Sequence, residues 1–258
     1  MLIPPSHLRN FFRVTPVGTL HVGAHLGEEA REYHSQGFGP LTWVEAQGHL
    51  IDALVEATRA WGDRVIHAAV WSESGIDIDL NISSNSQSTS LFDFSGHLSE
   101  YPDISFVRQE VVTTVRLDEV LPSDESFDLV CLDIQGAELE ALKGLGKRLS
   151  EVKWVYSEVN CAHLYRGIPL VDELDRYLEN HGFARVVTVW TTHGWGEALY
   201  ARGESRQVKN LRTIGVLYSL LAKASVWGLA KRISRLTKRT LDRIYSLLMR
   251  KRIKNNPR

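Results

Sequence analysis

The stretch TLHVGAHLG at residues 19–27 decides the fold of this chain. Its first four residues predict a short strand, because apolar and β-branched side chains predominate there. Gly23 and Gly27 predict a turn, and the acidic residues at 28–32 predict the first turn of a helix. Ligands of α/β proteins bind at the carboxyl ends of strands, so this glycine turn is the first candidate site.

The segments that follow repeat this alternation of strand and helix. We expect strands at 41–46 and 64–71, with a helix at 49–61 between them. Such alternation is typical of a parallel sheet with right-handed crossover connections. The same rhythm predicts, further along, strands at 127–133 and 152–159, helices at 136–149 and 170–181, and a closing antiparallel pair at 184–190 and 198–201.

The middle of the chain departs from this rhythm. Residues 76–82 alternate between polar and apolar side chains, which is typical of a half-exposed strand, and residues 106–115 are rich in β-branched side chains. The polar stretch at 83–90 lies between these two segments. We therefore expect an α/β fold with a Rossmann-like sheet, interrupted by an antiparallel insertion with a flexible loop.

The net charge of −1 over 258 residues conceals two oppositely charged parts. From Arg202 onward the chain has 16 basic and two acidic residues, whereas the preceding part has 14 basic and 29 acidic residues. Segments of opposite charge rarely share one role. The composition therefore predicts one acidic domain at residues 1–204 and a basic helical extension at residues 205–258, rather than two full domains.

The basic extension has apolar residues at helical spacing from residue 211 to 249, and residues 213–230 carry a single charge, on Lys223. Basic amphipathic helices bind anionic membrane surfaces, so we expect residues 211–250 to lie on such a surface. The alternative is a helical arm that packs on the acidic domain or in a dimer, and the sequence leaves the oligomeric state open. Nucleic acid is a poor partner, because the most basic part has few aromatic residues.

The cysteines and the N-terminal residues bear on the cell compartment. Cys131 and Cys161 do not make a disulfide framework, and Cys131 lies in an apolar run typical of a buried thiol. Residues 1–14 contain no apolar stretch long enough for a signal peptide. We expect a cytoplasmic protein, peripheral at the inner membrane surface if its tail binds lipid.

A carboxylate ends the second predicted strand. Glu45 follows Gly23 by 22 positions, and an acid at this place accepts hydrogen bonds from both hydroxyl groups of a ribose. Gly23 and Gly27 lack the third glycine of dinucleotide-binding turns, which disfavours a nicotinamide dehydrogenase. A nucleoside cofactor that carries methionine fits this turn better. The plain alternative is a tight strand-to-helix turn with an exposed glutamate.

Further polar residues stand where later strands end. Asp133 follows a central apolar run, where it can hold an acceptor, take its proton or face a sulfonium cation. With Glu158 and Asn160 it offers oxygen ligands to Mg²⁺, but such acids are common in α/β enzymes and we expect no metal. Glu138 suits a helix first turn as a partner of the dipole. Four histidines have no metal-ligand spacing and are assigned to surface or core positions: His34, His49, His67 and His97.

Several motifs, in order along the chain, resemble those of the FkbM-like methyltransferase family. VGAHLG at 22–27 resembles its DVGANxG opening, and WVEA at 43–46 resembles the end of its second strand. The later matches are AAVWSESG at 68–75, VRLDEVL at 115–121, DIQGAE at 133–138, Glu158 with Asn160, and GEALY at 196–200. Together these matches cover most of the chain and are far more specific than any one of them.

The resemblance implies a class I fold that binds S-adenosylmethionine. It further implies methyl transfer to a hydroxyl oxygen of a small-molecule or glycan acceptor, most often a sugar, a glycan or a natural product. The residues that it assigns to the cofactor are Gly23, Ala24, His25 and Gly27 around the methionine part, Glu45 at the ribose, and Trp71.

The same resemblance places Asp133 and Glu158 at the reaction centre. A hydroxyl acceptor benefits from a base that removes its proton during attack. The candidates for this base, in falling order, are Asp133, Glu158 and His163.

Two positions depart from the family pattern. His21 stands where the family has the acid of its first strand, and Gln135 replaces an acid in the DvEGaE motif. His21 removes a carboxylate that helps to hold the methionine amine, and Gln135 keeps hydrogen-bonding capacity but loses charge. The alternative function is therefore a catalytically weak or inactive cofactor-binding protein on the same fold, tethered to a membrane or partner by its basic tail.

Overall fold

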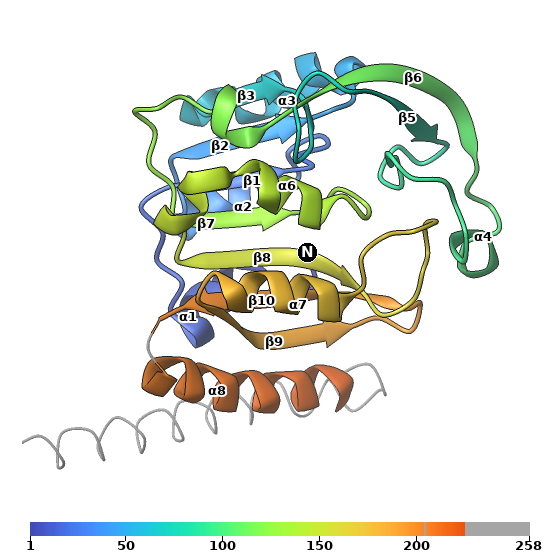
Figure 1. The fold of residues 1–258 in the computed structure, drawn as a ribbon. Coiled ribbons are helices and arrows are strands. Elements are labelled where there is room, and N and C mark those ends of the chain that lie inside the picture. The colour runs from blue at the N-terminus through green and yellow to red at the C-terminus, as the bar shows by residue number, and fades with distance from the viewer. Residues whose placement is uncertain (204, 225–258) are drawn as a thin grey trace, which may run out of the picture. The chain divides into compact units, whose positions relative to one another are not determined.

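A computed structural model describes residues 1–203 and 205–224 of the chain. Its main sheet has seven strands in the order β3-β2-β1-β7-β8-β10-β9 (Figure 1). The five strands from β3 to β8 are parallel, and β10 is antiparallel to both of its neighbours. The predicted Rossmann-like sheet with an antiparallel closing pair is confirmed. The strands are β1 (Thr19–Val22), β2 (Leu41–Glu45), β3 (Arg64–His67), β7 (Leu129–Leu132), β8 (Trp154–Asn160), β9 (Phe183–Trp190) and β10 (Trp195–Arg202).

Helices cover both faces of this sheet. In Figure 1, α6 and α7 lie in front of the strands and α1 and α2 lie behind them. Short 3-10 turns, η1 and η2, flank α3, and a third, η3, follows α6. The bounds are α1 (Pro5–Phe12), α2 (Ala30–Ser35), η1 (Gly48–Leu50), α3 (Ile51–Thr58), η2 (Arg59–Trp61), α5 (Leu117–Val120), α6 (Glu138–Gly144), η3 (Gly146–Glu151) and α7 (Val171–Asn180).

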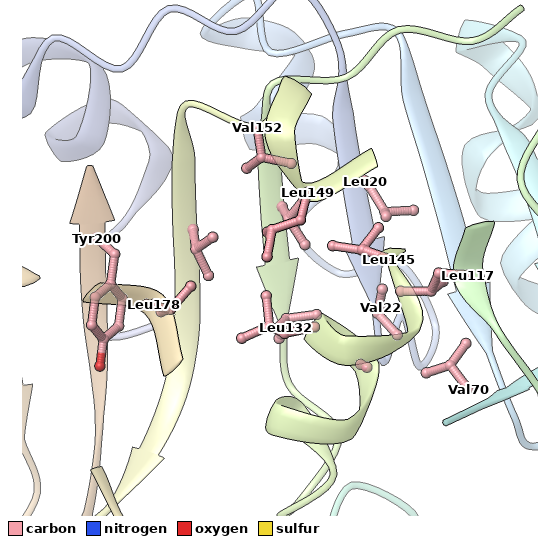
Figure 2. Close-up of a cluster of buried hydrophobic side chains, with 14 of the residues drawn as sticks. Leu20, Val22, Val70, Leu117, Leu132, Leu145, Leu149, Val152, Leu178 and Tyr200 are labelled. Carbon is pink, nitrogen blue, oxygen red and sulfur yellow. The ribbon is translucent and has the colours of Figure 1, made fainter. Parts of the chain in front are cut away.

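The central strands of the sheet are buried because side chains pack against both of their faces. Leu20 and Val22 of β1 pack with Leu145, beyond the end of α6, and with other apolar side chains (Figure 2). His21 points to the other face, where its ring lies 5.0 Å from that of Trp43 and 5.7 Å from that of Tyr33. A parallel strand covered by helices on both sides reads as an almost continuous apolar run, as found here.

Cys131 is a buried thiol on this second face, as its apolar surroundings in the sequence predict. It accepts a hydrogen bond from the Tyr33 hydroxyl at 3.2 Å. Burial raises the pKa of the thiol to about 12, so Cys131 is unreactive at neutral pH.

The insertion forms a second sheet, with the order β4-β6-β5. Its strands are β4 (Ala69–Val70), β5 (Asp77–Ser83) and β6 (Phe106–Val115), and the short helix α4 (His97–Glu100) lies between β5 and β6. β5 and β6 are antiparallel, as predicted.

Two predicted elements are shorter than expected. The strand predicted at 64–71 is interrupted at Ala68, because its N–H still bonds to Glu45 whereas that of Trp71 bonds to Val115 of β6. The helix predicted at 136–149 ends at Gly144, and its α-helical form is not continued because Gly146 has a positive φ of 51°.

The C-terminal helix α8 spans Ser205–Ala224. The chain divides into two compact units, residues 1–215 and residues 216–258. Within the first unit, Arg212 of α8 donates to the Arg185 carbonyl of β9 at 2.9 Å. None of the described helices is both long and apolar enough to cross a bilayer. The boundary at 204/205 and the membrane-surface role of residues 211–250 stay predictions, and most of that tail lies outside the described residues.

Candidate functional site

A cavity of about 440 Å³ lies at the carboxyl ends of β1, β2, β7 and β8. Its volume is within the roughly 300–1,000 Å³ of small-molecule sites. We distinguish two ends of the cavity by the residues that line them. The glycine-turn end comprises Gly23, Ala24, His25, Glu45, Gln47 and Ser86, and the aromatic end comprises His97, Tyr101, Ile104, Leu164 and Trp195.

Gly23 is required by the close approach of two strand ends. Its φ is +86°, and a Cβ built there would overlap the carbonyl oxygen of Asp133. The N–H groups of Gly23 and Ala24 both donate to the Val44 carbonyl, at 2.9 and 3.1 Å. The glycine thus lets β1, β2 and β7 end together at one edge of the cavity.

Gly27, predicted to lie at the methionine part of the cofactor, packs against α3. It is absent from the residues that line the cavity, and its φ is +72°. A Cβ at this position would lie 2.9 Å from the Leu54 side chain and 3.3 Å from that of Thr58. Gly27 therefore lets the turn pack against α3, and its predicted contact with the cofactor has no support in the cavity wall.

Glu45 is buried at the end of β2, and its carboxylate is oriented by backbone donors. The N–H of His25 donates to Oε2 at 2.7 Å, and the N–H of Gln47 donates to Oε1 at 2.8 Å. A carboxylate has about four acceptor positions, so each oxygen keeps capacity for one more donor. The geometry matches a carboxylate that receives the two hydroxyl groups of a ribose.

The polar segment 85–91 lines the cavity and is fastened to the glycine-turn end. His25 Nε2 forms a hydrogen bond with Ser86 Oγ at 2.7 Å, and Gln47 Nε2 donates to the Ser86 carbonyl at 3.1 Å. The Thr89 hydroxyl donates to Gln47 Oε1 at 3.1 Å. These bonds hold the predicted loop of the insertion over the turn, while its flexibility stays a prediction.

Asp133 and Glu158 are brought together by Gln135. The Gln135 side-chain amide donates to Asp133 Oδ1 at 2.8 Å and to Glu158 Oε2 at 3.0 Å. Its Oε1 accepts a hydrogen bond from the Tyr165 hydroxyl at 2.7 Å. The amide therefore bridges two carboxyl groups, and an acid at this position would place three of them in contact.

The environments of Asp133 and Glu158 differ. Asp133 is exposed at the cavity, whereas Glu158 is buried. Burial, together with the Asp133 and Glu138 carboxylates, raises the pKa of Glu158 well above its usual range. These surroundings therefore favour the protonated form of Glu158 more than solvent does.

Glu138 does more than complement a helix dipole, as the sequence suggested. Its Oε1 accepts the N–H groups of Ile134 and Gly136, each at 3.1 Å. Burial is the main reason that the pKa of Glu138 is raised to about 7. Glu138 fixes the loop that carries Gln135, and so supports the pair of acids from behind.

The aromatic end lies next to this pair of acids. The Tyr165 ring, whose hydroxyl contacts Gln135, is 5.4 Å from the His97 ring. The His97 ring is in turn 5.0 Å from that of Tyr101, and Trp195 Nε1 donates to the Tyr101 hydroxyl at 2.8 Å. Asp133 thus stands between Gly23 on one side and, through Gln135 and Tyr165, the aromatic end on the other.

His21 and Glu197 line the cavity from the face of the sheet that carries α2. Burial lowers the pKa of His21, and its Nδ1 is 3.2 Å from the Tyr33 hydroxyl. Glu197 of β10 is the register partner of Glu158 and is also buried. It accepts hydrogen bonds from the Tyr156 hydroxyl and the Leu2 N–H. Position 21 thus lacks the carboxyl group of the family pattern, but Glu197 supplies a buried carboxyl group to the same cavity.

Two predicted site residues lie away from the cavity. His163 is exposed, and its carbonyl accepts a hydrogen bond from the Gly96 N–H at 3.0 Å. The Trp71 ring packs 5.8 Å from that of Phe92, outside the lining residues. Within residues 1–203 and 205–224, no group of three or more His, Cys, Asp and Glu side chains could hold a metal ion.

Sequence reasoning missed several lining residues, namely Gln47, Ser86, His97, Tyr101, Trp195 and Glu197. Glu197 lies in the GEALY motif, so the resemblance contained a signal for it. The aromatic residues carried no such signal, because chain segments far apart in sequence bring them together.

Comparison with known proteins identifies the fold and the cofactor class. The pattern of the Methyltransferase FkbM domain matches residues 21–184. The chain belongs to the FkbM methyltransferase family. An FkbM domain uses S-adenosylmethionine, as the glycine turn and Glu45 predict.

One curated relative is 2-O-methyltransferase NoeI of Sinorhizobium fredii (strain NBRC 101917 / NGR234). It is 33% identical over 122 residues, which are 43% of this chain and 50% of the relative. The chain therefore matches about half the length of this relative.

Similar solved structures include magnesium protoporphyrin IX methyltransferase of Synechocystis PCC 6803 (11% identity, TM-score 0.46, 77% of this chain and 80% of that one). Another is a ribosomal protein L11 methylase of Lactobacillus delbrueckii subsp. bulgaricus (13% identity, TM-score 0.41, 75% of each chain).

Proposed function

We propose that this FkbM domain transfers the methyl group of S-adenosylmethionine to a hydroxyl oxygen of a small-molecule or glycan acceptor, such as a sugar. The observation that supports this most is the position of Asp133, between the glycine-turn end and the aromatic end of one cavity. The relative NoeI, a 2-O-methyltransferase, also supports transfer to oxygen.

The residues of the glycine-turn end fit the cofactor by their chemistry. Glu45 offers two oriented carboxylate oxygens to the ribose hydroxyls. Apolar walls for the adenine come from Val44, Ala46 and residues 68–70, which line the cavity beside Glu45. Gly23, Ala24 and His25 would hold the methionine part.

Asp133 is the base that we favour, because it alone of the three candidates is exposed at the cavity and lines it. Gln135 engages its Oδ1, and its Oδ2 has no hydrogen-bond partner among the described residues. Glu158, whose pKa is raised by burial, would position the acceptor by a hydrogen bond. His163 is exposed and is not among the residues that line the cavity, so we do not favour it as the base.

The bound cofactor supplies a methyl group that its sulfonium already activates, so positioning provides much of the rate. Asp133 would take the proton of the acceptor hydroxyl as attack proceeds. General-base catalysis contributes roughly 10²- to 10⁴-fold, which sets the expected cost of losing this carboxylate.

Methyl transfer from labelled S-adenosylmethionine to a panel of glycosides and small alcohols tests the proposal. Asp133→Asn should lower kcat by at least about 100-fold, whereas His163→Gln, a histidine outside the cavity, should leave it unchanged. Binding of S-adenosylhomocysteine without transfer to any member of the panel would favour the alternative, an inactive cofactor-binding protein. Equal kcat in Asp133→Asn would refute the assignment of the base.

A further inference from the structure

The ring of His97 is fixed in the aromatic end by contacts on several sides. It stacks on Phe94 with ring centroids 4.1 Å apart and an angle of 8° between the planes. The backbone N–H of His97 donates to the Leu164 carbonyl at 2.9 Å, which ties the insertion to the segment after β8. The ring nitrogens are therefore held in place before any ligand arrives.

Among the residues that the structure describes, one of these nitrogens has no hydrogen-bond partner. His97 is only 3% exposed, and its Nδ1 is buried without a hydrogen bond. Burial lowers the pKa of His97, so the neutral ring offers one N–H and one lone pair. Because Nδ1 is closed to solvent, an acceptor in the cavity that His97 lines would meet the other nitrogen of the ring, Nε2.

The neighbouring side chains indicate the kind of molecule that fits there. Tyr101 and Trp195 are joined by a hydrogen bond, and Ile104 and Leu164 add apolar surface. Aromatic and apolar walls bind the weakly polar face of a ring, while a few placed polar atoms bind its hydroxyl groups. His193 Nδ1 forms a hydrogen bond with Glu100 Oε2 at 2.8 Å, and the His193 ring lies 5.0 Å from that of Tyr101.

We propose that the aromatic end is the acceptor subsite and that His97 selects the acceptor, by a hydrogen bond to an oxygen of a compact, hydroxyl-bearing ring such as a pyranose. This inference rests on the proposed function, because it brings the reactive hydroxyl of the ring to Asp133. His97 binds the acceptor and takes no proton from it.

The test uses the full-length protein saturated with S-adenosylhomocysteine. Saturation-transfer difference NMR is recorded with methyl β-D-glucopyranoside, methyl β-D-galactopyranoside and methyl α-L-rhamnopyranoside. At least one glycoside should receive saturation from the wild-type protein, and His97→Phe should weaken its binding about tenfold. The affinity for S-adenosylhomocysteine should be equal in both proteins. The matched control, His163→Phe, alters a histidine outside the cavity and should change neither binding.

Thermal unfolding gives an independent readout. His97→Phe keeps an aromatic ring on Phe94 and removes the unpaired nitrogen, so its Tm should equal or exceed that of the wild type. A second variant, Ile104→Trp, fills the aromatic end and should abolish saturation transfer without weakening S-adenosylhomocysteine binding.

Three results would overturn the inference. They are no saturation transfer to any glycoside, equal saturation transfer in His97→Phe and the wild type, or a Tm of His97→Phe several degrees below that of the wild type. Failure of the wild type to bind S-adenosylhomocysteine would instead refute the proposed function itself. Binding of S-adenosylhomocysteine without binding of any glycoside would refute the acceptor subsite alone.

Discussion

The two ends of the cavity are built in different ways. At the glycine-turn end, residues 23–47 supply the turn, the Glu45 carboxylate and its two backbone donors within one short stretch of chain. At the aromatic end, His97, Leu164 and Trp195 come from three segments far apart in sequence. The first end is specified by local motifs, whereas the second depends on how the insertion docks onto the main sheet.

This difference also separates two kinds of recognition. Backbone N–H groups and one buried carboxylate dominate the glycine-turn end, and their positions follow from the turn itself. Side-chain rings dominate the aromatic end, where a substitution changes the shape of the wall without disturbing the sheet. A fixed cofactor suits the first construction, and selection among acceptors suits the second.

Gly23→Ala should break the glycine-turn end most severely. The new Cβ would overlap the Asp133 carbonyl at a residue with φ of +86°, so β1 and β7 could not end together. We expect a loss of more than about 4 kcal/mol in the free energy of unfolding, the range of the most severe single substitutions. Urea denaturation followed by circular dichroism measures this loss.

Gly75→Ala is the matched control for this substitution. Gly75 has a similar φ of +83°, but nothing lies within 4 Å of a Cβ built there. It should cost only about 1–2 kcal/mol, the effect of the backbone conformation alone. Equal losses in the two variants would show that the approach of Gly23 to Asp133 is unimportant.

Gln135→Glu should have the next largest effect, at the junction of the two ends. It places a third carboxyl group against Asp133 and Glu158, where burial and charge repulsion raise the pKa of the new acid. Such a group holds its proton more tightly in the folded state, so stability is lost as pH rises through its folded pKa.

We expect the Gln135→Glu protein to lose about 3 kcal/mol relative to wild type at pH 8 and much less at pH 5. Urea denaturation at the two pH values measures both losses. Gln36→Glu, at the end of α2 and away from the carboxyl groups of the cavity, serves as the control and should show no such pH dependence. A Gln135→Glu protein as stable as wild type at pH 8 would argue against the bridging role of the amide.

Glu197→Gln should have a smaller effect. Burial is the main cause that raises the pKa of Glu197 to about 7, from an ordinary value of 4.5. The folded state therefore binds a proton more tightly than the unfolded state, and this carboxyl group makes stability fall as pH rises from about 4.5 to 7.

The glutamine variant lacks this titration, so the fall in stability between pH 5 and pH 8 should be about 2.5 kcal/mol smaller than in wild type. Differential scanning calorimetry at the two pH values measures this difference. An unchanged fall would mean that Glu197 is ionised throughout this range.

The sequence predicts the parallel sheet, the glycine turn and Glu45, because these depend on local patterns, but it does not predict Gln47 and Ser86 at the same end of the cavity. The apolar runs of β1, β2 and β7 and the spacing from Gly23 to Glu45 suffice for the sheet, the turn and the acid. The break at Ala68 could not be predicted in this way, because it depends on the pairing of β4 with β6, which lies about 40 residues later.

Only the parts of the candidate site that depend on local patterns were predicted. Strand-end acids such as Asp133 and Glu158 follow from the position of the strands, and the structure places both beside the cavity. Trp71 and His163 were assigned by resemblance and order alone, and their side chains lie elsewhere. His97 was assigned to the surface or core, because only tertiary packing shows that a buried ring nitrogen is left without a partner.

Isothermal titration with S-adenosylhomocysteine tests the central assignment, that Glu45 binds the cofactor ribose, most directly. Glu45→Ala should weaken binding roughly ten- to 150-fold, the loss expected for a charged hydrogen-bond partner. Glu56→Ala removes an exposed carboxylate of α3 that lies outside the residues lining the cavity, and its affinity should stay within about threefold of wild type. Equal affinity of Glu45→Ala and the wild-type protein would contradict the assignment.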